Sequence, residues 1–423
     1  MKAIVAHPAQ QHSYRLAAAL AHNGMLYKYA TTVYCAKGSL TALAAALLRG
    51  RFRQKAKSRK CPDLCDGDVL RFCEAGGLIK LLAMNVPLFR PFYRRLKYGV
   101  ADRFAKKTAA YAIKHGVDAV ICYDDYSAKL FEILKEKAPG IVRIMDASAA
   151  NTVYMRSIYE RDFILMPEFA SELRMERKVV WDEAAIERAQ KEAALADHII
   201  AASGFTKRSF VECGVPESKV SVCPYGVDTD LFAPKKPGEF HKAGEPVRFI
   251  YVGGVKQLKG IGYLLKAFED VDPGKATLTV VGSADNGQID LSAAPDCVTF
   301  SGSVLHGEVP ALLKAADVFV FPSLGDGFSL AVLEAAACSL PVIVSENTGA
   351  CDLIENGTEG FVIPVQSSEA IAEKVNWFIE HPESIKPMGT AARRLAEKLT
   401  WENYEQGIRR VFERRAWENG SNN

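Results

Sequence analysis

The sequence predicts an α/β protein made of two units, each with a mostly parallel β-sheet covered by helices. Short apolar runs such as Val318–Phe321 and Val342–Val344 are typical of strands that are buried on both faces. Helical patterns separate such runs along the chain, which indicates parallel strands joined by right-handed crossovers. A segment rich in proline, glycine and charge, 226–246, interrupts the alternation. At 423 residues the chain also exceeds the usual size of one domain.

The first unit is expected to span residues 1–225. Its strands are predicted at Lys2–His7, Leu26–Tyr34, Val69–Phe72, Asp118–Tyr123, Ile141–Met145, His198–Ala202 and Val220–Pro224. Helical periodicity covers Tyr14–Ala21, Leu40–Leu48, Ser127–Lys137 and much of Leu78–Lys114. The basic stretch 49–60 is expected to be a loop.

The second unit is expected to span residues 247–399, after a linker at 226–246. Three strands, Val247–Val252, Thr277–Val281 and Val298–Phe300, precede the two apolar runs described above. The last segment, 400–423, has apolar residues at helical spacing, namely Trp401, Tyr404, Ile408, Val411 and Phe412.

Composition and charge exclude several classes of protein. Hydrophobic residues make up 49% and charged residues 24%, values that are ordinary for a globular protein. No signal peptide and no apolar run of 18 residues is visible, and the ten cysteines suggest reduced thiols, so we expect a cytoplasmic protein. Three residues separate Cys61 from Cys65, but no further ligands follow at zinc spacing, so no metal is expected.

The segment 318–346 carries the strongest chemical signal. It reads as a strand, a loop with Gly325 and Gly327, a helix and a second strand, and the carboxylates Asp326 and Glu334 bracket the junction of loop and helix. At the start of that helix, amides without intrahelical partners would face the ligand crevice of the sheet, namely those of Phe328, Ser329 and Leu330. Free amides suit a phosphate, and a carboxylate suits hydroxyls. A nucleotide-sugar offers both groups.

The same segment resembles the donor-binding signature of retaining family 4 glycosyltransferases, which have the GT-B fold. Their motif is Glu-x7-Glu within P-S-x-x-E-G-F-x-x-x-x-L-E-A-x-A-x-G-x-P-V-I. Two positions depart from it: Asp326 replaces the first Glu, and Ser339–Leu340 replaces the Gly before Pro341. The matching residues are Pro322, Ser323, Gly327, Phe328, Leu333, Glu334, Ala335, Ala337, Pro341, Val342 and Ile343.

The resemblance extends to two further blocks and implies a complete architecture. Residues 197–234 are similar to the family's interdomain segment, and Tyr251–Gly260 is similar to its glycine loop. The family's fold implies two Rossmann-like domains facing across a cleft, with a C-terminal helix, here 400–423, that crosses back to the N-terminal domain. The resemblance also implies that Asp326 holds the sugar, that Glu334 holds the ribose and that no metal cofactor is needed.

In the glycine loop, the resemblance implies that Lys259 stabilises the departing diphosphate. The family places an Arg five residues earlier, where this chain has Gly254, and Lys256 is a candidate to supply the missing charge. Farther along, Val304 is a candidate for contact with the nucleotide base, while His306 reads equally well as a solvated loop residue.

On the acceptor side the first strand ends in a loop that contains Gln10 and His12, which stand where the family usually has a Gly-Gly pair. Both are candidates to place side-chain donors in the cleft. The loop after Asp118–Tyr123 lacks the histidine found in many relatives. There Asp124 is a candidate to orient the acceptor hydroxyl or to act as its base, whereas Asp125 could cap the next helix.

Basic residues gather in 49–60 and 89–107, and aromatic residues interleave with them in the second segment. Such segments suit an anionic membrane surface. The alternative is an ordinary solvated loop followed by a half-buried helix. No recognition motif for nucleic acid accompanies the charge, so binding to nucleic acid is not expected.

Together these observations predict a retaining glycosyltransferase that moves a sugar from a nucleotide-diphosphate sugar to a glycan or lipid-linked acceptor, in the synthesis of a cell-envelope polysaccharide or lipopolysaccharide. It would work in the cytoplasm, or on the inner face of the cytoplasmic membrane. A nucleotide-sugar epimerase with the same fold and a non-catalytic nucleotide-sugar-binding protein are the alternatives.

Overall fold

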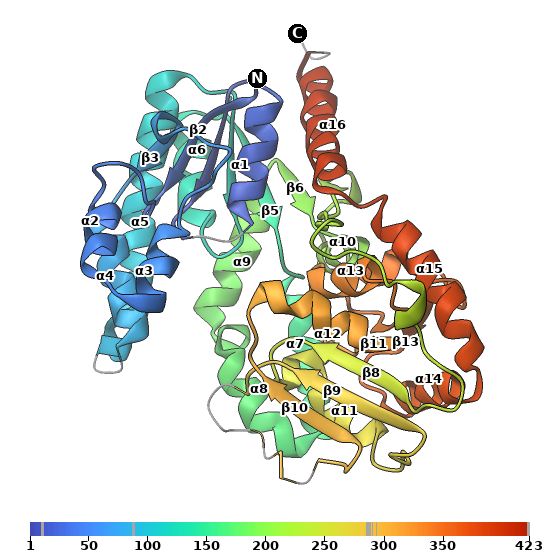
Figure 1. Cartoon of the computed structure of the whole chain (residues 1–423). Coiled ribbons are helices and arrows are strands. Elements are labelled where there is room, and N and C mark those ends of the chain that lie inside the picture. The colour runs from blue at the N-terminus through green and yellow to red at the C-terminus, as the bar shows by residue number, and fades with distance from the viewer. Residues whose placement is uncertain (10–11, 87–88, 285–288, 290, 293, 421–423) are drawn as a thin grey trace.

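The computed structural model describes residues 1–9, 12–86, 89–284, 289, 291–292 and 294–420. The N-terminal unit holds a seven-stranded parallel sheet in the order β3-β2-β1-β4-β5-β6-β7 (Figure 1). Its strands are β1 (Ala3–His7), β2 (Leu26–Thr31), β3 (Val69–Arg71), β4 (Ala119–Tyr123), β5 (Val142–Ala147), β6 (His198–Ala201) and β7 (Val220–Val222).

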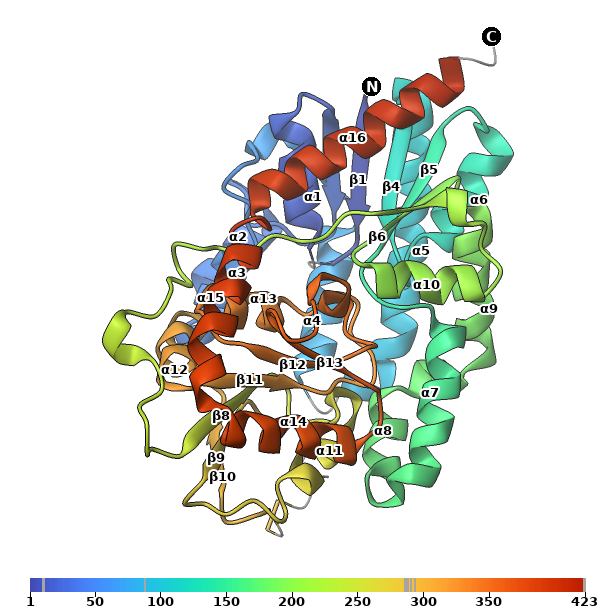
Figure 2. The same cartoon turned by 90° about the vertical axis from the view of Figure 1, so that its right-hand side faces the viewer.

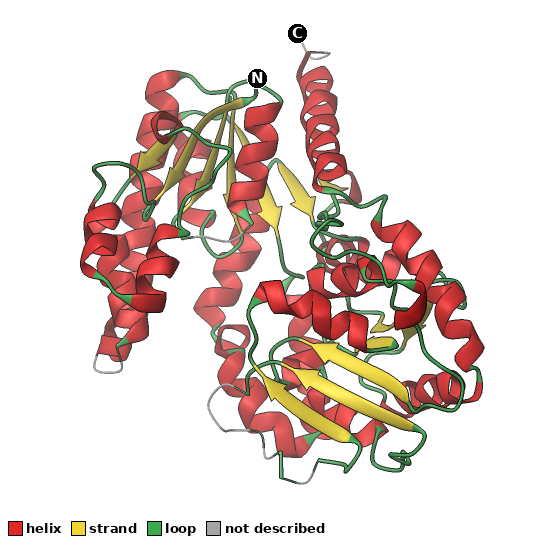
Figure 3. Ribbon diagram, viewed as in Figure 1, coloured by secondary structure: helices red, strands yellow, loops and turns green. Residues whose placement is uncertain are grey.

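Helices cover both faces of this sheet (Figure 3). They are α1 (Ser13–His22), α2 (Leu40–Leu47), α3 (Gly50–Lys57), α4 (Glu74–Asn85), α5 (Arg90–His115), α6 (Ala128–Lys137), α7 (Thr152–Leu165), α8 (Ala170–Glu176), α9 (Glu183–Leu195) and α10 (Gly204–Glu212). The expected loop at 49–60 was wrong, because most of this stretch forms α3, which packs against α2.

The C-terminal unit holds a six-stranded parallel sheet in the order β10-β9-β8-β11-β12-β13. Its strands are β8 (Val247–Val252), β9 (Ala276–Val281), β10 (Val298–Gly302), β11 (Val318–Phe321), β12 (Val342–Ser345) and β13 (Gly360–Ile363). The apolar runs of the 318–346 segment pair in parallel, with Phe319 opposite Val342, and both strands are buried along their whole length. The sequence pattern did not indicate β13.

The helices of this unit are α11 (Ile261–Ala267), α12 (Val309–Ala315), α13 (Leu330–Ala337), α14 (Ser368–Glu380) and α15 (Ile385–Ala396). The helix after β11 therefore begins at Leu330, two residues later than the sequence suggested, because Ser329 adopts a left-handed backbone conformation with φ of 59°. The residues Phe328 and Ser329 thus belong to the loop that leads into α13.

The last helix, α16 (Trp401–Gly420), returns to the N-terminal unit and runs beside α1, as Figure 2 shows. Tyr404 is buried there, next to the ring of Tyr225, and Glu405 pairs with His22 of α1. Two parallel-sheet units with a helix that crosses back confirm the predicted fold.

A search of the described residues finds no helix that combines the length and the apolar character needed to cross a bilayer.

Candidate active site

A cavity of about 250 Å³ lies between the two units, and residues of both units line it. His12, Ser148 and Tyr225 come from the N-terminal half, and the C-terminal half contributes Val252, Gly253, Lys259, Phe321, Asp326, Phe328, Ser329, Leu330 and Ala331. Six residues that the sequence singled out for chemistry therefore share one cavity: His12, Lys259, Asp326, Phe328, Ser329 and Leu330. They lie at the carboxyl ends of β1, β8 and β11, where parallel sheets bind their ligands.

Asp326 and Lys259 form an ion pair inside this cavity. The Lys259 ammonium donates a hydrogen bond to Oδ2 of Asp326, and the Phe328 amide donates to Oδ1 at 3.2 Å. Burial alone would raise the pKa of Asp326, but the charge of Lys259 and the hydrogen bonds outweigh it and hold that pKa below its usual value. The carboxylate is therefore charged at neutral pH.

This arrangement corrects one prediction about the phosphate site. The amide of Phe328 was expected to be free for a phosphate, yet it already bonds the Asp326 carboxylate. A donor phosphate that approaches Lys259 must therefore compete with Asp326, while the loop at Ser329 and Leu330 still lines the cavity.

Glu334 lies on α13 and pairs with His306, whose Nε2 atom is 3.0 Å from the Glu334 Oε1. The glutamate side chain is 14% exposed, whereas His306 remains 65% exposed, so this contact faces solvent. Val304 precedes His306 by two residues and is half-buried. The pairing of His306 with Glu334 was not predicted, because the two residues are 28 positions apart and meet only through the fold.

In the glycine loop after β8, the side chain of Lys256 lies beside Gly254. A Cβ atom built on Gly254 would lie 3.6 Å from both Cδ and Cε of Lys256. The aliphatic part of Lys256 therefore occupies the space into which a side chain at position 254 would extend. This geometry favours the view that Lys256 supplies the charge that the glycine lacks.

Gly327 lies where the two units touch. A Cβ atom at this position would come within 2.0 Å of the Ser148 carbonyl oxygen, so only glycine fits. Its own carbonyl accepts hydrogen bonds from the hydroxyls of Ser203, at 2.6 Å, and Thr206, at 3.1 Å. The predicted donor residue Gly327 is thus also a contact between the units.

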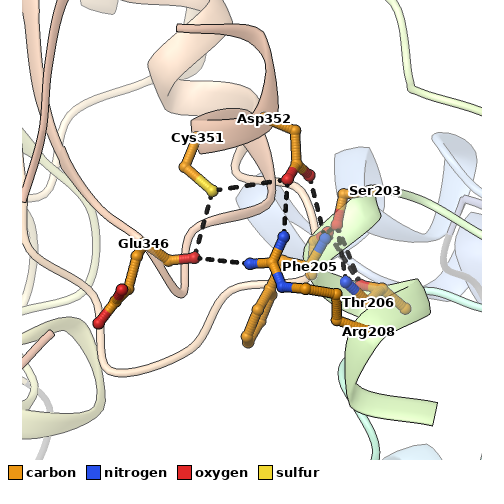
Figure 4. A network of polar contacts seen from close by, with 8 residues as sticks. Ser203, Phe205, Thr206, Arg208, Glu346, Cys351 and Asp352 are labelled. Atoms are coloured by element: carbon orange, nitrogen blue, oxygen red, sulfur yellow. Dashed lines mark hydrogen bonds and ion pairs between the residues drawn. The ribbon is translucent and has the colours of Figure 1, made fainter. Parts of the chain in front are cut away.

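A network of polar contacts continues this interface at the start of α10, shown in Figure 4. Asp352 accepts a hydrogen bond from the Phe205 amide at 3.0 Å and pairs with Arg208 at 2.9 Å. Arg208 also donates to the Glu346 carbonyl at 3.2 Å. The C-terminal unit therefore caps a helix of the N-terminal unit, which ties the two units together at this point.

A second interface holds the loop that carries Lys259. Gln257 donates its side-chain amide to Asp162 at 3.0 Å, and its backbone amide donates to Glu172 at 3.0 Å. Asp162 also accepts from the hydroxyl of Tyr263 at 2.8 Å. Because Asp162 and Glu172 belong to α7 and α8, the N-terminal unit positions a loop of the donor side.

Asp124 follows the carboxyl end of β4 and is half-buried. A single hydrogen bond connects it to a residue that lines the cavity. The hydroxyl of Ser148, which lines the cavity, donates to Asp124 Oδ1 at 3.3 Å. Burial, together with the nearby charges of Asp125 and Asp146, raises the pKa of Asp124 to about 7. A carboxyl group with such a pKa can accept a proton near neutral pH.

His12 closes the N-terminal side of the cavity. Its ring centroid lies 4.7 Å from that of Tyr225, which in turn contacts the ring of Phe328 at 5.2 Å. Burial lowers the pKa of His12, and the charge of Asp326 only partly opposes this effect. The imidazole is therefore neutral at pH 7 and can donate one hydrogen bond. Its predicted partner Gln10 lies outside the described residues.

Sequence reasoning missed Ser148, Tyr225 and the contact of His306 with Glu334. Ser148 follows the carboxyl end of β5 in the same way that Asp124 follows β4, so the strand pattern offered a signal for it. No pattern in the sequence indicated the aromatic contacts of Tyr225 with His12 and Phe328. Among the described residues, no three His, Cys, Asp or Glu side chains gather as a metal site would require.

Comparisons with known proteins agree with this geometry. A family model described as "Glycosyl transferases group 1" matches residues 246–381, and one described as "Glycosyltransferase Family 4" matches residues 86–231. The amylovoran biosynthesis glycosyltransferase AmsK of Erwinia amylovora is 28% identical over 204 residues, which cover 45% of this chain and 49% of the relative.

A second relative is the GDP-mannose-dependent alpha-(1-6)-phosphatidylinositol monomannoside mannosyltransferase of Mycobacterium tuberculosis. It is 27% identical over 216 residues, or 47% of this chain and 56% of the relative. The chain thus spans about half the length of the curated relatives it matches.

Solved structures match nearly the whole chain. The sucrose-phosphate synthase of Thermosynechococcus elongatus has a TM-score of 0.67 and 20% identity, and the match covers 98% of this chain and 99% of that one. Anabaena Alr3699/HepE, in complex with UDP, has a TM-score of 0.60 and 18% identity, over 98% and 100% of the two chains. At such identity the likeness establishes the fold. Together with the two family models, it shows that this chain belongs to the family 4, group 1 glycosyltransferases and has their GT-B fold.

Proposed function

We propose that this protein transfers a sugar from a nucleotide-diphosphate sugar to a glycan or lipid-linked acceptor, with retention of the anomeric configuration. The observation that carries the proposal is the Lys259–Asp326 pair, which lies in a cavity that both units line. A cation for the diphosphate and a carboxylate for sugar hydroxyls stand side by side where a nucleotide-sugar would place its phosphates and its sugar.

In the proposed reaction, the bond between the sugar C1 and the diphosphate oxygen breaks while the acceptor hydroxyl forms a new bond to C1 on the same face. Lys259 and the amides at the start of α13 stabilise the negative charge of the leaving diphosphate. The hydroxyl proton passes to the departing phosphate or to Asp124, whose raised pKa suits a base near neutral pH. Asp326 holds sugar hydroxyls in this scheme, and His12 donates a hydrogen bond from the acceptor side.

The nucleotide part would lie along α13 and the glycine loop. Glu334 is proposed to bind the ribose hydroxyls, exchanging its contact with His306 for them. Gly254, Lys256 and Gly327 are proposed to approach the diphosphate, and Val304 the base. The scheme needs no metal, because Lys259 and the helix start supply positive charge at the leaving group.

The acceptor is proposed to belong to the cell envelope. One relative carries the name of a polysaccharide biosynthesis enzyme, and another that of a phosphatidylinositol mannoside mannosyltransferase. All ten cysteines are free thiols in the structure, which supports a reducing compartment such as the cytoplasm.

Titration of the purified protein with UDP, GDP, ADP and TDP, and with their sugars, tests the donor site. One nucleotide class should bind and raise the melting temperature, and Glu334→Ala should weaken that binding at least tenfold. Nuclear magnetic resonance of the product then gives the anomeric configuration, and inversion would contradict the retaining scheme. Donor turnover without an acceptor would favour an epimerase, and binding without any turnover would favour a binding protein.

A further inference from the structure

An unusual apolar surface covers the end of the N-terminal unit formed by α2, α3, α4 and the start of α5. In the described part of the chain, ten of the eighteen exposed large apolar side chains come from this surface. They are Leu40, Leu43, Leu47, Leu48, Phe52, Ile79, Leu82, Met84, Phe89 and Phe92, and we call them the apolar face. Solvent is an unfavourable environment for so many neighbouring apolar side chains, so this face is expected to have a partner.

The individual exposures are large. Leu47 is 87% exposed, Leu43 and Phe92 are each 61% exposed, and Leu82 is 54% exposed. Leu43 and Leu47 are four residues apart on α2, so they point the same way. The helix α2 contacts both α3 and α4, and α4 packs on α5, so the helices that carry this face are neighbours in the fold (Figure 1).

A groove of about 690 Å³ runs between α4 and α5 within this surface. Its lining is mostly apolar, and two arginines, Arg95 and Arg103, line it as well. The remaining lining residues are Ile79, Leu82, Ala83, Phe89, Phe92, Leu96, Gly99 and Val100. An apolar groove edged by arginines suits a ligand that combines hydrocarbon with phosphate.

Strong positive charge surrounds the apolar face. Residues 40–62 contain seven Lys or Arg and no acid, and residues 79–107 contain eight and only one acid, Asp102. These two segments therefore carry a net charge of +14, and since the whole chain has +3, the rest carries −11. On α3 the cations Arg53, Lys55 and Lys57 are exposed.

We infer that the apolar face and its surrounding cations bind the surface of an anionic lipid bilayer. Apolar side chains would enter the boundary between headgroups and acyl chains, while the lysines and arginines contact lipid phosphates. A second copy of this chain is a poorer occupant, because two faces of high positive charge would repel each other. Nucleic acid would not use the exposed leucines of α2.

The face also lies close to the cavity between the units. On α4, Lys80 follows Ile79 of the apolar face, and its ammonium donates to the Pro8 carbonyl at 3.1 Å. Pro8 directly follows β1 and stands four positions before His12, which lines the cavity. A bilayer on the apolar face would therefore lie beside the acceptor side of the site, where a lipid-linked acceptor could reach it.

Flotation of the full-length protein with vesicles tests this inference. Vesicles of phosphatidylcholine with 30% phosphatidylglycerol should bind the protein at least tenfold more strongly than pure phosphatidylcholine vesicles, and added salt should weaken the binding. The double variant Leu43→Glu/Leu47→Glu should lose at least tenfold, and Arg53→Glu/Lys57→Glu should lose a similar factor. Controls are Ile164→Glu, at an 82% exposed position on α7, and Lys242→Glu, at an exposed position in the linker. Both should bind within twofold of the wild type.

The inference would be overturned by a folded wild type that binds no anionic vesicle, or by equal binding of the leucine variant. Light scattering identifies the competing occupant: a dimer that Leu43→Glu/Leu47→Glu dissociates, without vesicle binding, would assign the face to a second copy. Nucleotide binding by the same samples tests the proposed transfer function separately, because the apolar face does not include the donor site.

Discussion

Replacing Asp326 with Asn should strengthen the binding of a free nucleoside diphosphate while it impairs sugar transfer. In the structure the ammonium of Lys259 donates a hydrogen bond to the Asp326 carboxylate. Asn keeps the size of the side chain and an oxygen for the Phe328 amide, but it removes the charge that competes with the diphosphate for Lys259.

The size of the effect follows from the burial of the pair. Two unit charges about 4 Å apart interact by about 4 kcal/mol at an effective dielectric constant of about 20. The side chains of Lys259 and Asp326 remain 24% and 18% exposed, so solvent screens part of this interaction. If roughly 1.4 kcal/mol of the Lys259–Asp326 interaction no longer has to be given up when the diphosphate binds, the Kd of the diphosphate falls about tenfold.

Isothermal titration calorimetry with the preferred nucleoside diphosphate measures this change directly. Asp326→Asn should lower its Kd about tenfold, yet reduce turnover of the sugar donor more than tenfold, because sugar hydroxyls lose their charged acceptor. Lys259→Met should weaken the binding of the diphosphate. The free nucleoside, which has no phosphate, should bind the wild type and Asp326→Asn with the same affinity. Unchanged or weaker diphosphate binding by a folded Asp326→Asn protein would refute the competition between Asp326 and the ligand.

Three further predictions concern stability, the domain contact and metal dependence. Burial raises the pKa of Asp146 to about 7, so the folded state binds an extra proton and loses stability as pH rises from about 4 through 7. The gain in unfolding free energy from Asp146→Asn should therefore be larger at pH 8.5 than at pH 5, by up to about 3 kcal/mol, and equal gains at both pH values would contradict this origin. Gly327→Ala should lower both the melting temperature and turnover, because its Cβ would meet the Ser148 carbonyl, whereas Gly238→Ala, with open space around it, should change neither. Excess EDTA should leave turnover unchanged, and a loss restored by a divalent cation would show that the reaction needs a metal.

The parts of the fold that could be predicted are those in which a local run of apolar residues indicates a buried segment. The strands β8 and β11 were found to the residue, because apolar runs between turn signals leave few alternatives. The strand β13 was missed, since it begins at a glycine and only three apolar residues follow, Phe361–Ile363. The helix α3 was read as a loop because its charge hid a helical segment with few apolar positions.

In the candidate site, too, local sequence patterns identified some residues, whereas contacts between distant segments were not predicted. Asp326 was identified at a junction of loop and helix, and Lys259 in the loop that resembles the family's glycine loop. The fold then brought the two into contact across 67 residues. The pairing of Glu334 with His306 and the role of Ser148 depend on how strands lie side by side. Such contacts between distant segments have no local pattern, so the sequence alone did not reveal them.

The close approach of Gly327 to Ser148 would couple the two proposed substrates. Gly327 lies in the loop that would hold the donor, whereas Ser148 bonds Asp124 on the acceptor side. A donor that shifts this loop must also shift the backbone next to Asp124, because no side chain lies between them to absorb the movement. If donor binding raises the affinity for the acceptor by some factor, thermodynamic linkage requires the acceptor to raise the affinity for the donor by the same factor. Either substrate, bound first, would then favour the binding of the other, and this synergy would follow from one glycine.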